Sequence, residues 1–388
     1  MNNFTHYQPT KINFGINELD KLGIIAKTYG NRCLLITPEP IEVLKPLFNR
    51  AKKILKDIDM EVFHYDKVMP NPYSTMVDEA VEMAYSNDVD VVIALGGGSS
   101  IDTGKIVSYY ARQGNVEWKQ LFENKTHNFN DAQTINKDKL PLIAVSTTSG
   151  TGSQCTQAAV ITDDKTDMKT TLFNLQFFPE QCIVDPKLME TLPYSLTAST
   201  GFDAFCHLSE SYLNGRLSPM VKVLTIDAIK TIVSSLPKLR NDNNIKYREE
   251  LALADTIAGI SLSNGGANIP HFLGEILTSV NQTINHGTSL AIIYPHFVEE
   301  YFEDDQYHEG ILDLVEIFNP SLERNEVTKE KATETIVDFL EKINLNVKIS
   351  NFTDKEEDIN NIKEIVASGY SKRYSNKEKL LSIITKAI

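Results

Sequence analysis

The sequence predicts an α/β domain built on a parallel sheet, followed by an all-helical domain. Short apolar runs alternate with helical patterns as far as Pro186, and no strand pattern follows it. Strands that alternate with helices in this way are typical of a parallel sheet covered on both faces. The length of 388 residues favours two domains. We place them at residues 1–188 and 189–388.

Each strand of the first domain is expected from a short apolar run that ends at a turn or loop signal. Helical spacing fills two of the intervals, from Ile41 to Asp57 and from Ser74 to Ser86. The polar stretch from Asn115 to Asp138 is predicted to be a surface insertion. The predicted strands are Cys33–Thr37, Glu61–Phe63, Val89–Leu95, Leu140–Val145 and Cys182–Pro186.

Charge and composition argue against several classes of partner. A formal net charge of -14 disfavours nucleic acid and anionic membranes, because both require a basic surface. No apolar run reaches the roughly 18 residues of a membrane span, and the N-terminus lacks a signal-peptide core. The four cysteines form no CxxC pair, which indicates reduced thiols. We therefore expect a cytoplasmic protein that binds neither nucleic acid nor membrane.

Two loops rich in glycine and hydroxyl groups follow predicted strands and form a candidate nucleotide site. They are Gly96–Asp102 and Thr147–Ser153. Glycines let a pyrophosphate approach the backbone, and the N-terminus of a helix offers free N–H groups. Open α/β sheets bind nucleotides at the carboxyl ends of their strands, so the two loops together favour a dinucleotide site. Alternatively, Ser99 and Asp102 form a helix capping box, and the second loop only turns the chain.

The segment from Asp203 to His207 is a candidate metal-binding element, because residues four apart share one face of a helix. His271 and His286 follow further along the chain. One carboxylate and three imidazoles suit Fe²⁺, Zn²⁺ or a similar ion and leave a position open for substrate. Alternatively, Asp203 caps a helix or forms a salt bridge, and the histidines bind no metal. Cys206 is expected to be a packed thiol.

In order and context, these motifs resemble those of the iron-containing (group III) alcohol dehydrogenase family over nearly the whole chain. The matching elements are Pro70-Asn71-Pro72, Gly96-Gly97-Gly98-Ser99-x-x-Asp102, Thr147-Thr148-x-Gly150-Thr151-Gly152-Ser153, Gly201-x-Asp203-Ala204-x-x-His207-x-x-Glu210, the segment from Ser263 to His271, and Asn285-His286-Gly287. The resemblance implies a Rossmann-like first domain, a helical second domain as in dehydroquinate synthase-like proteins, and a metal in the cleft between them.

The resemblance also implies roles for individual residues. It makes Asp203, His207, His271 and His286 the metal ligands. The expected cofactor contacts are Thr37, Glu39, Gly96, Gly97, Gly98, Ser99, Asp102, Thr147, Thr148, Thr151, Ser153 and Lys169.

NAD and NADP both remain open as the cofactor. Members that prefer NAD often carry an aspartate beside the adenosine ribose, where this chain has Pro38. The next residue, Glu39, either reaches the 2′-hydroxyl and favours NAD or points away and admits the 2′-phosphate of NADP.

Two residues and one spacing depart from the family pattern. Gln154 stands where a glutamate is common, and Glu275 stands where many relatives have a second histidine. The separation of His271 and His286 is one residue longer than expected. Since Glu275 follows His271 by four residues, we predict that it shares the catalytic site with the four ligands; a solvated surface glutamate is the alternative.

The expected activity is a metal-dependent, NAD(P)-linked alcohol dehydrogenase or aldehyde reductase. The metal would polarise the oxygen of a small alcohol or aldehyde while the cofactor carries the hydride. A dehydroquinate synthase-like lyase and a catalytically inactive relative are the alternatives. The resemblance also implies a homodimer or a higher homo-oligomer.

Overall fold

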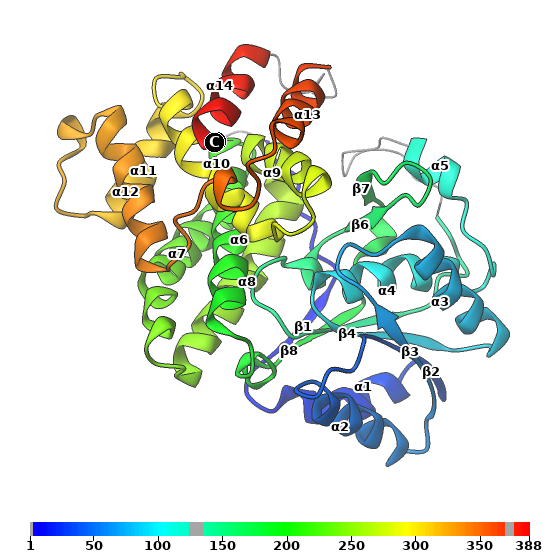
Figure 1. Cartoon of the computed structure of the whole chain (residues 1–388). Helices are drawn as coiled ribbons and strands as arrows, with labels where there is room; N and C mark the ends of the chain where they lie inside the picture. Colours follow the sequence, from blue (N-terminus) through cyan, green and yellow to red (C-terminus); the bar gives the residue numbers. More distant parts are fainter. Residues whose placement is uncertain (1–2, 124–134, 369–375) are drawn as a thin grey trace. The chain divides into compact units, whose positions relative to one another are not determined.

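A six-stranded sheet in the order β1-β8-β5-β4-β2-β3 organises the first half of the chain (Figure 1). The computed structural model describes residues 3–123, 135–368 and 376–388. All neighbouring strands of this sheet are parallel, which confirms the predicted fold class. The strands are β1 (Lys11–Phe14), β2 (Arg32–Pro38), β3 (Glu61–Val68), β4 (Val91–Gly96), β5 (Leu142–Ser146) and β8 (Gln181–Val184).

Helices cover both faces of this sheet. On one face, α1 (Leu22–Lys27) and α2 (Lys45–Lys56) join alternate strand residues in one apolar core. The other face carries α4 (Gly98–Tyr110), whose Gly104 lies so close that an added Cβ would be 2.7 Å from the Cβ of Ala94. Successive residues of a strand point to opposite faces of the sheet. A sheet with helices on both faces therefore needs the continuous apolar runs seen in the sequence.

Some local features differ from the sequence expectations. An antiparallel hairpin of β6 (Ala158–Thr162) and β7 (Lys169–Phe173) was not predicted, because β7 buries only one residue and no tight-turn dipeptide joins the two strands. The predicted insertion contains α5 (Trp118–Glu123), and its residues 124–134 lie outside the described part of the chain.

The alternative prediction, that Ser99 and Asp102 form a helix capping box, is wrong. The N-cap of α4 is Gly97, which makes no side-chain cap bond. The Asp102 carboxylate is instead taken up by the neighbouring segment, where it accepts hydrogen bonds from the backbone N of Val160 at 3.0 Å and from the Ser153 hydroxyl.

The chain divides into two units. The sheet unit comprises Tyr7–Thr148 and Gly152–Thr191, and the helical unit comprises Leu192–Ile388, Ser149–Thr151 and the N-terminal residues up to His6. No helix of the described residues is long and apolar enough to cross a membrane.

The helical unit is built around α6 (Tyr194–Leu213), which is buried along most of its length. Its Phe202 and Phe205 pack against Tyr294 with ring centroids 5.8 and 5.3 Å apart. The other helices are α7 (Pro219–Ser235), α8 (Ile245–Gly265), α9 (Ile269–Val280), α10 (His286–Tyr301), α11 (His308–Phe318), α12 (Lys329–Lys342), α13 (Glu356–Ala367) and α14 (Lys377–Ala387).

Candidate active site

One face of α6 carries three polar side chains inside an apolar core. Asp203, His207 and Glu210 follow one another at one-turn spacing, and all three are buried. Buried charges are normally paired or coordinate a metal, because an isolated charge is costly to remove from water. This face of α6 is therefore a candidate for the reactive centre.

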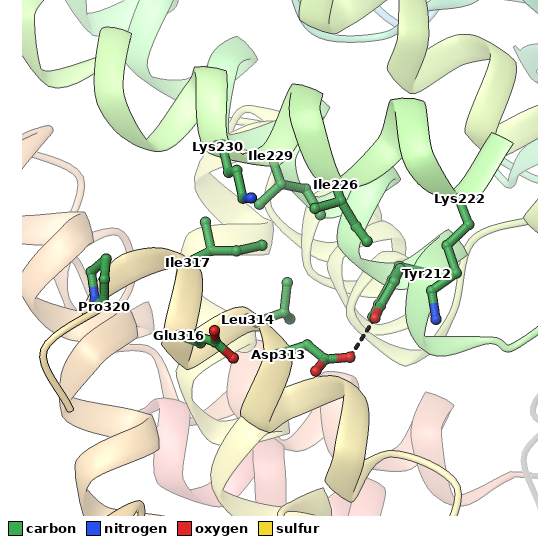
Figure 2. A pocket seen from close by; sticks show the side chains of 10 residues that line it. All are labelled: Tyr212, Lys222, Ile226, Ile229, Lys230, Asp313, Leu314, Glu316, Ile317 and Pro320. Carbon is green, nitrogen blue, oxygen red and sulfur yellow. Dashed lines mark hydrogen bonds between the residues drawn. The ribbon is translucent and has the colours of Figure 1, made fainter. Parts of the chain in front are cut away.

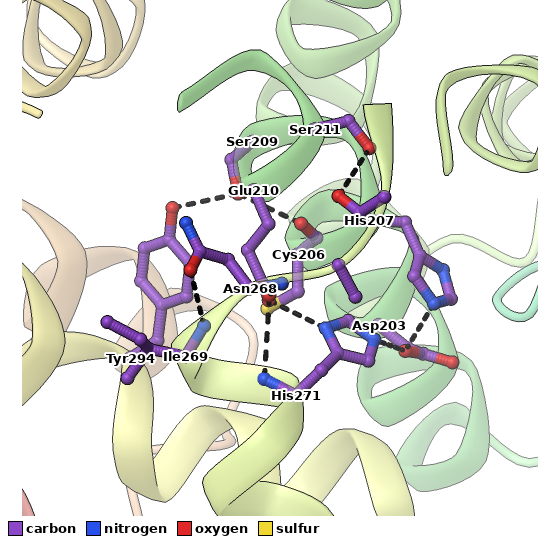
Figure 3. A network of polar contacts seen from close by, with 12 residues as sticks. Asp203, Cys206, His207, Ser209, Glu210, Ser211, Asn268, Ile269, His271 and Tyr294 are labelled. Atoms are coloured by element: carbon purple, nitrogen blue, oxygen red, sulfur yellow. Dashed lines mark hydrogen bonds and ion pairs between the residues drawn. The ribbon is translucent and has the colours of Figure 1, made fainter. Parts of the chain in front are cut away.

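Two further imidazoles, from α9 and α10, approach the same carboxylate. Measured from the Oδ1 atom of Asp203, the Nε2 atoms of His207, His271 and His286 lie at 3.7, 3.4 and 3.6 Å. Figure 3 shows Asp203, His207 and His271 turned toward one another. The structure thus brings together all four residues that the sequence named as metal ligands.

This arrangement fits one divalent ion. Two ligands of a tetrahedral ion, each about 2.1 Å from it, lie about 3.4 Å apart, close to the separations around Asp203. Ligand atoms of Asp203, His207 and His271 all lie within 4.8 Å of one another. The buried atoms Asp203 Oδ1 and His271 Nε2 have no hydrogen-bond partner among the described residues. A bound cation would relieve this costly arrangement.

In two of these imidazoles, Nδ1, the ring nitrogen that does not face Asp203, lies beside a hydrogen-bond acceptor. His207 Nδ1 lies 3.1 Å from the carbonyl oxygen of Gly150, and His271 Nδ1 lies 2.7 Å from Oε1 of Glu210. An Nδ1–H donated to each acceptor leaves Nε2 as the neutral, metal-binding nitrogen.

The sequence reading placed Glu210 in a motif but gave it no role. Its Oε2 atom accepts a hydrogen bond from the backbone N of Asn268 at 2.6 Å, so the carboxylate also holds the N-terminus of α9 (Figure 3). Its position one turn beyond His207 on a buried helix was the available signal.

Two glycines allow this close assembly. A Cβ on Gly150 would lie 2.6 Å from the Cβ of Thr200, and a Cβ on Gly287 would lie 1.9 Å from the backbone oxygen of Ser199. Real side-chain atoms do not tolerate such distances. The segment around Gly150 and the start of α10 therefore reach α6 only because these residues lack side chains.

The charges in this cluster are strongly coupled. Burial raises the pKa of Asp203, but the imidazoles of His207, His286 and His271 outweigh it and bring the pKa to about 2. For His271 burial lowers the pKa, whereas the carboxylates of Glu210 and Asp203 raise it to about 10, so a metal ion that binds at Nε2 must displace a proton. For His207, burial has the larger effect, and its pKa is lowered. An ionised Asp203 suits the binding of a cation.

Within the sheet unit, the start of the second predicted cofactor loop lies beside the first loop. Gly96 and Ser146 are paired in β4 and β5, and the backbone N of Thr147 donates to the Gly96 oxygen at 3.0 Å. A Cβ on Gly97 would lie 3.3 Å from Cγ2 of Thr148. The half-buried Gly97, Gly98 and Ser99 stand at the start of α4, where the N–H groups of a helix attract anions.

Other residues expected to contact a cofactor are placed differently. Asp102 and Ser153 are buried, and the Ser153 hydroxyl donates to the Asp102 carboxylate. Thr37 is buried at the end of β2, 2.9 Å from Nε2 of His64, whereas Glu39 is exposed. Thr151 belongs to the short segment of the helical unit, and Lys169 begins β7.

Glu275 lies on α9 one turn after His271 and is half-buried.

A surface pocket of about 460 Å³ lies between α7 and α11 in the helical unit (Figure 2). At one end, the Tyr212 hydroxyl donates to Asp313, and the Lys222 ammonium lies 4.7 Å from the centre of the Tyr212 ring. Its lining contains none of the four ligand candidates, so the pocket is separate from the chemistry at Asp203.

Two family models together match nearly the whole chain. The model described as "Iron-containing alcohol dehydrogenase" matches residues 9–186, and the model described as "Fe-containing alcohol dehydrogenase family, C-terminal" matches residues 197–388.

Individual proteins match over similar lengths. The NAD-dependent methanol dehydrogenase of Bacillus methanolicus is 28% identical and covers 100% of both chains. The 1,3-propanediol dehydrogenase of Citrobacter freundii is 29% identical over 76% of this chain and 74% of its own. The structure of an archaeal halo-thermophilic alcohol dehydrogenase from a Red Sea brine pool is 30% identical. Its TM-score is 0.88, and the match covers 100% of this chain and 99% of that one. The alcohol dehydrogenase from Oenococcus oeni matches with 28% identity, a TM-score of 0.87 and 100% of both chains.

Proposed function

Because the chain belongs to the iron-containing alcohol dehydrogenase family, we propose that it oxidises a short primary alcohol with NAD⁺ and reduces the aldehyde in reverse. One observation carries this proposal: three imidazole nitrogens surround the buried Asp203 carboxylate at 3.4–3.7 Å. Two relatives are named for methanol and 1,3-propanediol, which supports a small alcohol as the substrate.

Four residues would hold the metal ion, Fe²⁺ or alternatively Zn²⁺: Asp203, His207, His271 and His286. When bound, the ion supplies a Lewis acid for the substrate oxygen. The Gly150 carbonyl and the Glu210 carboxylate hold two of the imidazoles in the required tautomer. His286 is 28% exposed, against 4–8% for the other three side chains, so we place the substrate on its side of the cluster.

NAD would lie on the first loop and on the start of the second, both of which belong to the sheet unit. The N-terminus of α4, at Gly97, Gly98 and Ser99, would take the pyrophosphate, and Thr147 and Thr148 would meet the nicotinamide ribose. Two relatives are named for NAD or NADH, which supports NAD over NADP. Steady-state kinetics with both cofactors test this choice, and a lower KM for NADP⁺ than for NAD⁺ would contradict it.

Glu275 is proposed to serve the same site as a proton acceptor. It shares one helix with His271 and is half-buried. The Glu275→Gln variant is expected to lower kcat and alter the acidic limb of the pH–rate profile, with metal content unchanged. A rise in KM alone would indicate substrate binding instead. Wild-type values of kcat, KM and pH profile would contradict both roles.

We further propose a cytoplasmic homo-oligomer. On α7, the side chains of Met220, Val223 and Leu224 are 60%, 68% and 46% exposed, and their three- and four-residue spacing puts them on one face. Light scattering coupled to size exclusion measures the mass in solution, and a monomer at micromolar concentration would contradict the oligomer.

The main proposal is tested with protein reconstituted with Fe²⁺ or Zn²⁺. We expect absorbance at 340 nm to rise with NAD⁺ and at least one of methanol, ethanol, 1,3-propanediol and butanol. The matched variant His271→Ala should lose metal and activity together. A metal-loaded wild type that oxidises no alcohol and reduces no aldehyde would contradict the function. Full metal content in His271→Ala would contradict the ligand assignment.

A further inference from the structure

Lys105 is a fully buried lysine in the sheet unit, and the chemistry proposed above does not use it. It lies on α4 with 0% exposure. Its ammonium donates to Ser153 Oγ at 2.7 Å, to Thr156 Oγ1 at 2.9 Å and to the backbone oxygen of Ala158. The Asp102 carboxylate lies 3.4 Å away. An ammonium has three donors, so this cage satisfies all of them.

The cage joins two segments that are distant in sequence. One is α4, whose first residues belong to the first cofactor loop, and the other runs from Ser153, the last residue of the second loop, to Val160. Asp102 strengthens the same connection, because it accepts from the Ser153 hydroxyl and from the backbone N of Val160. Two residues of α4 thus bind four residues of the second segment.

The cage anchors the chain where the second loop re-enters the sheet unit. Residues Ser149–Thr151 of this loop belong to the helical unit, and the chain returns to the sheet unit at Gly152, which has a left-handed φ of 57°. Ser153 is the first residue after this return and belongs to a three-residue 3-10 turn, Ser153–Cys155. A turn of this length supplies few hydrogen bonds of its own, and the cage adds side-chain bonds to Ser153 and Thr156.

A methionine of similar length would fill the same space without the cost of burying a charge. What the lysine adds is direction: its hydrogen bonds fix where Ser153 and Thr156 lie relative to the start of α4. We propose that Lys105 is a positioning residue for NAD, which holds the two cofactor loops at the separation that the dinucleotide requires. This inference rests on the proposed function, since it assumes that the loops bind NAD.

The proposal is tested by measuring how tightly the metal-loaded protein binds NADH. Binding is monitored by the change in NADH fluorescence during a titration. We expect Lys105→Met to raise the Kd for NADH about 10- to 100-fold, because small displacements of binding groups have effects of this size. The KM for the alcohol and the metal content should stay at the wild-type values.

Lys139→Met is the matched control. The Lys139 side chain is only 8% exposed and pairs with Glu180, but it precedes β5, at the end of the strand opposite to the loops. This variant should bind NADH like the wild type even if it melts earlier. Equal losses in both variants would overturn the proposal, because they would indicate general destabilisation. A folded Lys105→Met variant with the wild-type Kd would overturn it as well.

Thr156→Val keeps the test decisive if Lys105→Met does not fold. Valine has nearly the shape of threonine and removes only one acceptor of the ammonium. We expect a smaller rise in the Kd for NADH, about 3- to 10-fold, which corresponds to one hydrogen bond. An unchanged Kd would overturn the proposal. A wild-type protein that binds no NADH would instead contradict the proposed function.

Discussion

Glu210 offers a sharp test of how the metal ligands are held. Its two carboxylate oxygens accept from two different donors, Nδ1 of His271 at 2.7 Å and the backbone N of Asn268 at 2.6 Å. A Glu210→Gln substitution keeps the shape but replaces one oxygen with an NH₂ group. Either Nδ1 of His271 or the backbone N of Asn268 must then face the NH₂ group, which is itself a donor.

Both orientations of the glutamine weaken the site. If the NH₂ group faces His271, the imidazole accepts at Nδ1 and carries its proton on Nε2, which is the ligand atom. If it faces Asn268, a buried N–H loses its acceptor, at a cost of about 1–3 kcal/mol in stability. We expect metal affinity to fall about 10- to 100-fold, or about 1.4–2.8 kcal/mol.

The assay is metal retention against a graded series of chelator concentrations, with bound iron or zinc measured by elemental analysis. Glu250→Gln is the control, because Glu250 lies on α8 in the same unit and accepts from the Ser235 hydroxyl, away from the ligands. It should keep wild-type retention. A folded Glu210→Gln variant with the wild-type chelator midpoint would refute the argument that this carboxylate sets the His271 tautomer.

Three further outcomes are expected. Gly97→Val should raise the KM for NAD⁺ about tenfold or more, since an added Cβ alone would lie 3.3 Å from Cγ2 of Thr148 and the larger valine would part the two loops; an unchanged KM in the folded variant would argue against a pyrophosphate site there. Gly150→Ala should cost about 1–3 kcal/mol in thermal unfolding and weaken metal retention, because the new methyl would lie 2.6 Å from the Cβ of Thr200; a wild-type melting curve would contradict this close packing. All four cysteines are buried and free of disulfides, and burial, with a smaller effect of Asp90, raises the pKa of Cys33 to about 12. A thiol reagent at about pH 8 should therefore label none of them in the folded protein and all four after denaturation, as counted by mass spectrometry; rapid labelling of the native protein would contradict their burial.

The sequence alone was sufficient for the repeating local features. Apolar runs in the first half predicted five strands of the parallel sheet, because a strand covered on both faces needs apolar side chains in both directions. Helical spacing predicted α3 (Ser74–Ser86) and the shared face of Asp203 and His207. These features depend on residues close in sequence, so a pattern within one segment is enough to reveal them. By contrast, β7 buries only Leu172, and no tight-turn dipeptide joins it to β6, so the hairpin left no such pattern.

Only the tertiary structure decided which polar groups meet. Nothing near Gly150 in the sequence shows that its carbonyl receives His207, and nothing near Lys105 shows that four oxygens surround its ammonium. The same holds for His271 and His286, which sequence could assign only through family resemblance. These contacts join segments far apart in the chain, and their geometry is set by the packing of α6, α9 and α10 and by the return of the second loop to the sheet. Burial then determines their energies, because a charge or an unpaired nitrogen becomes costly only where water is excluded.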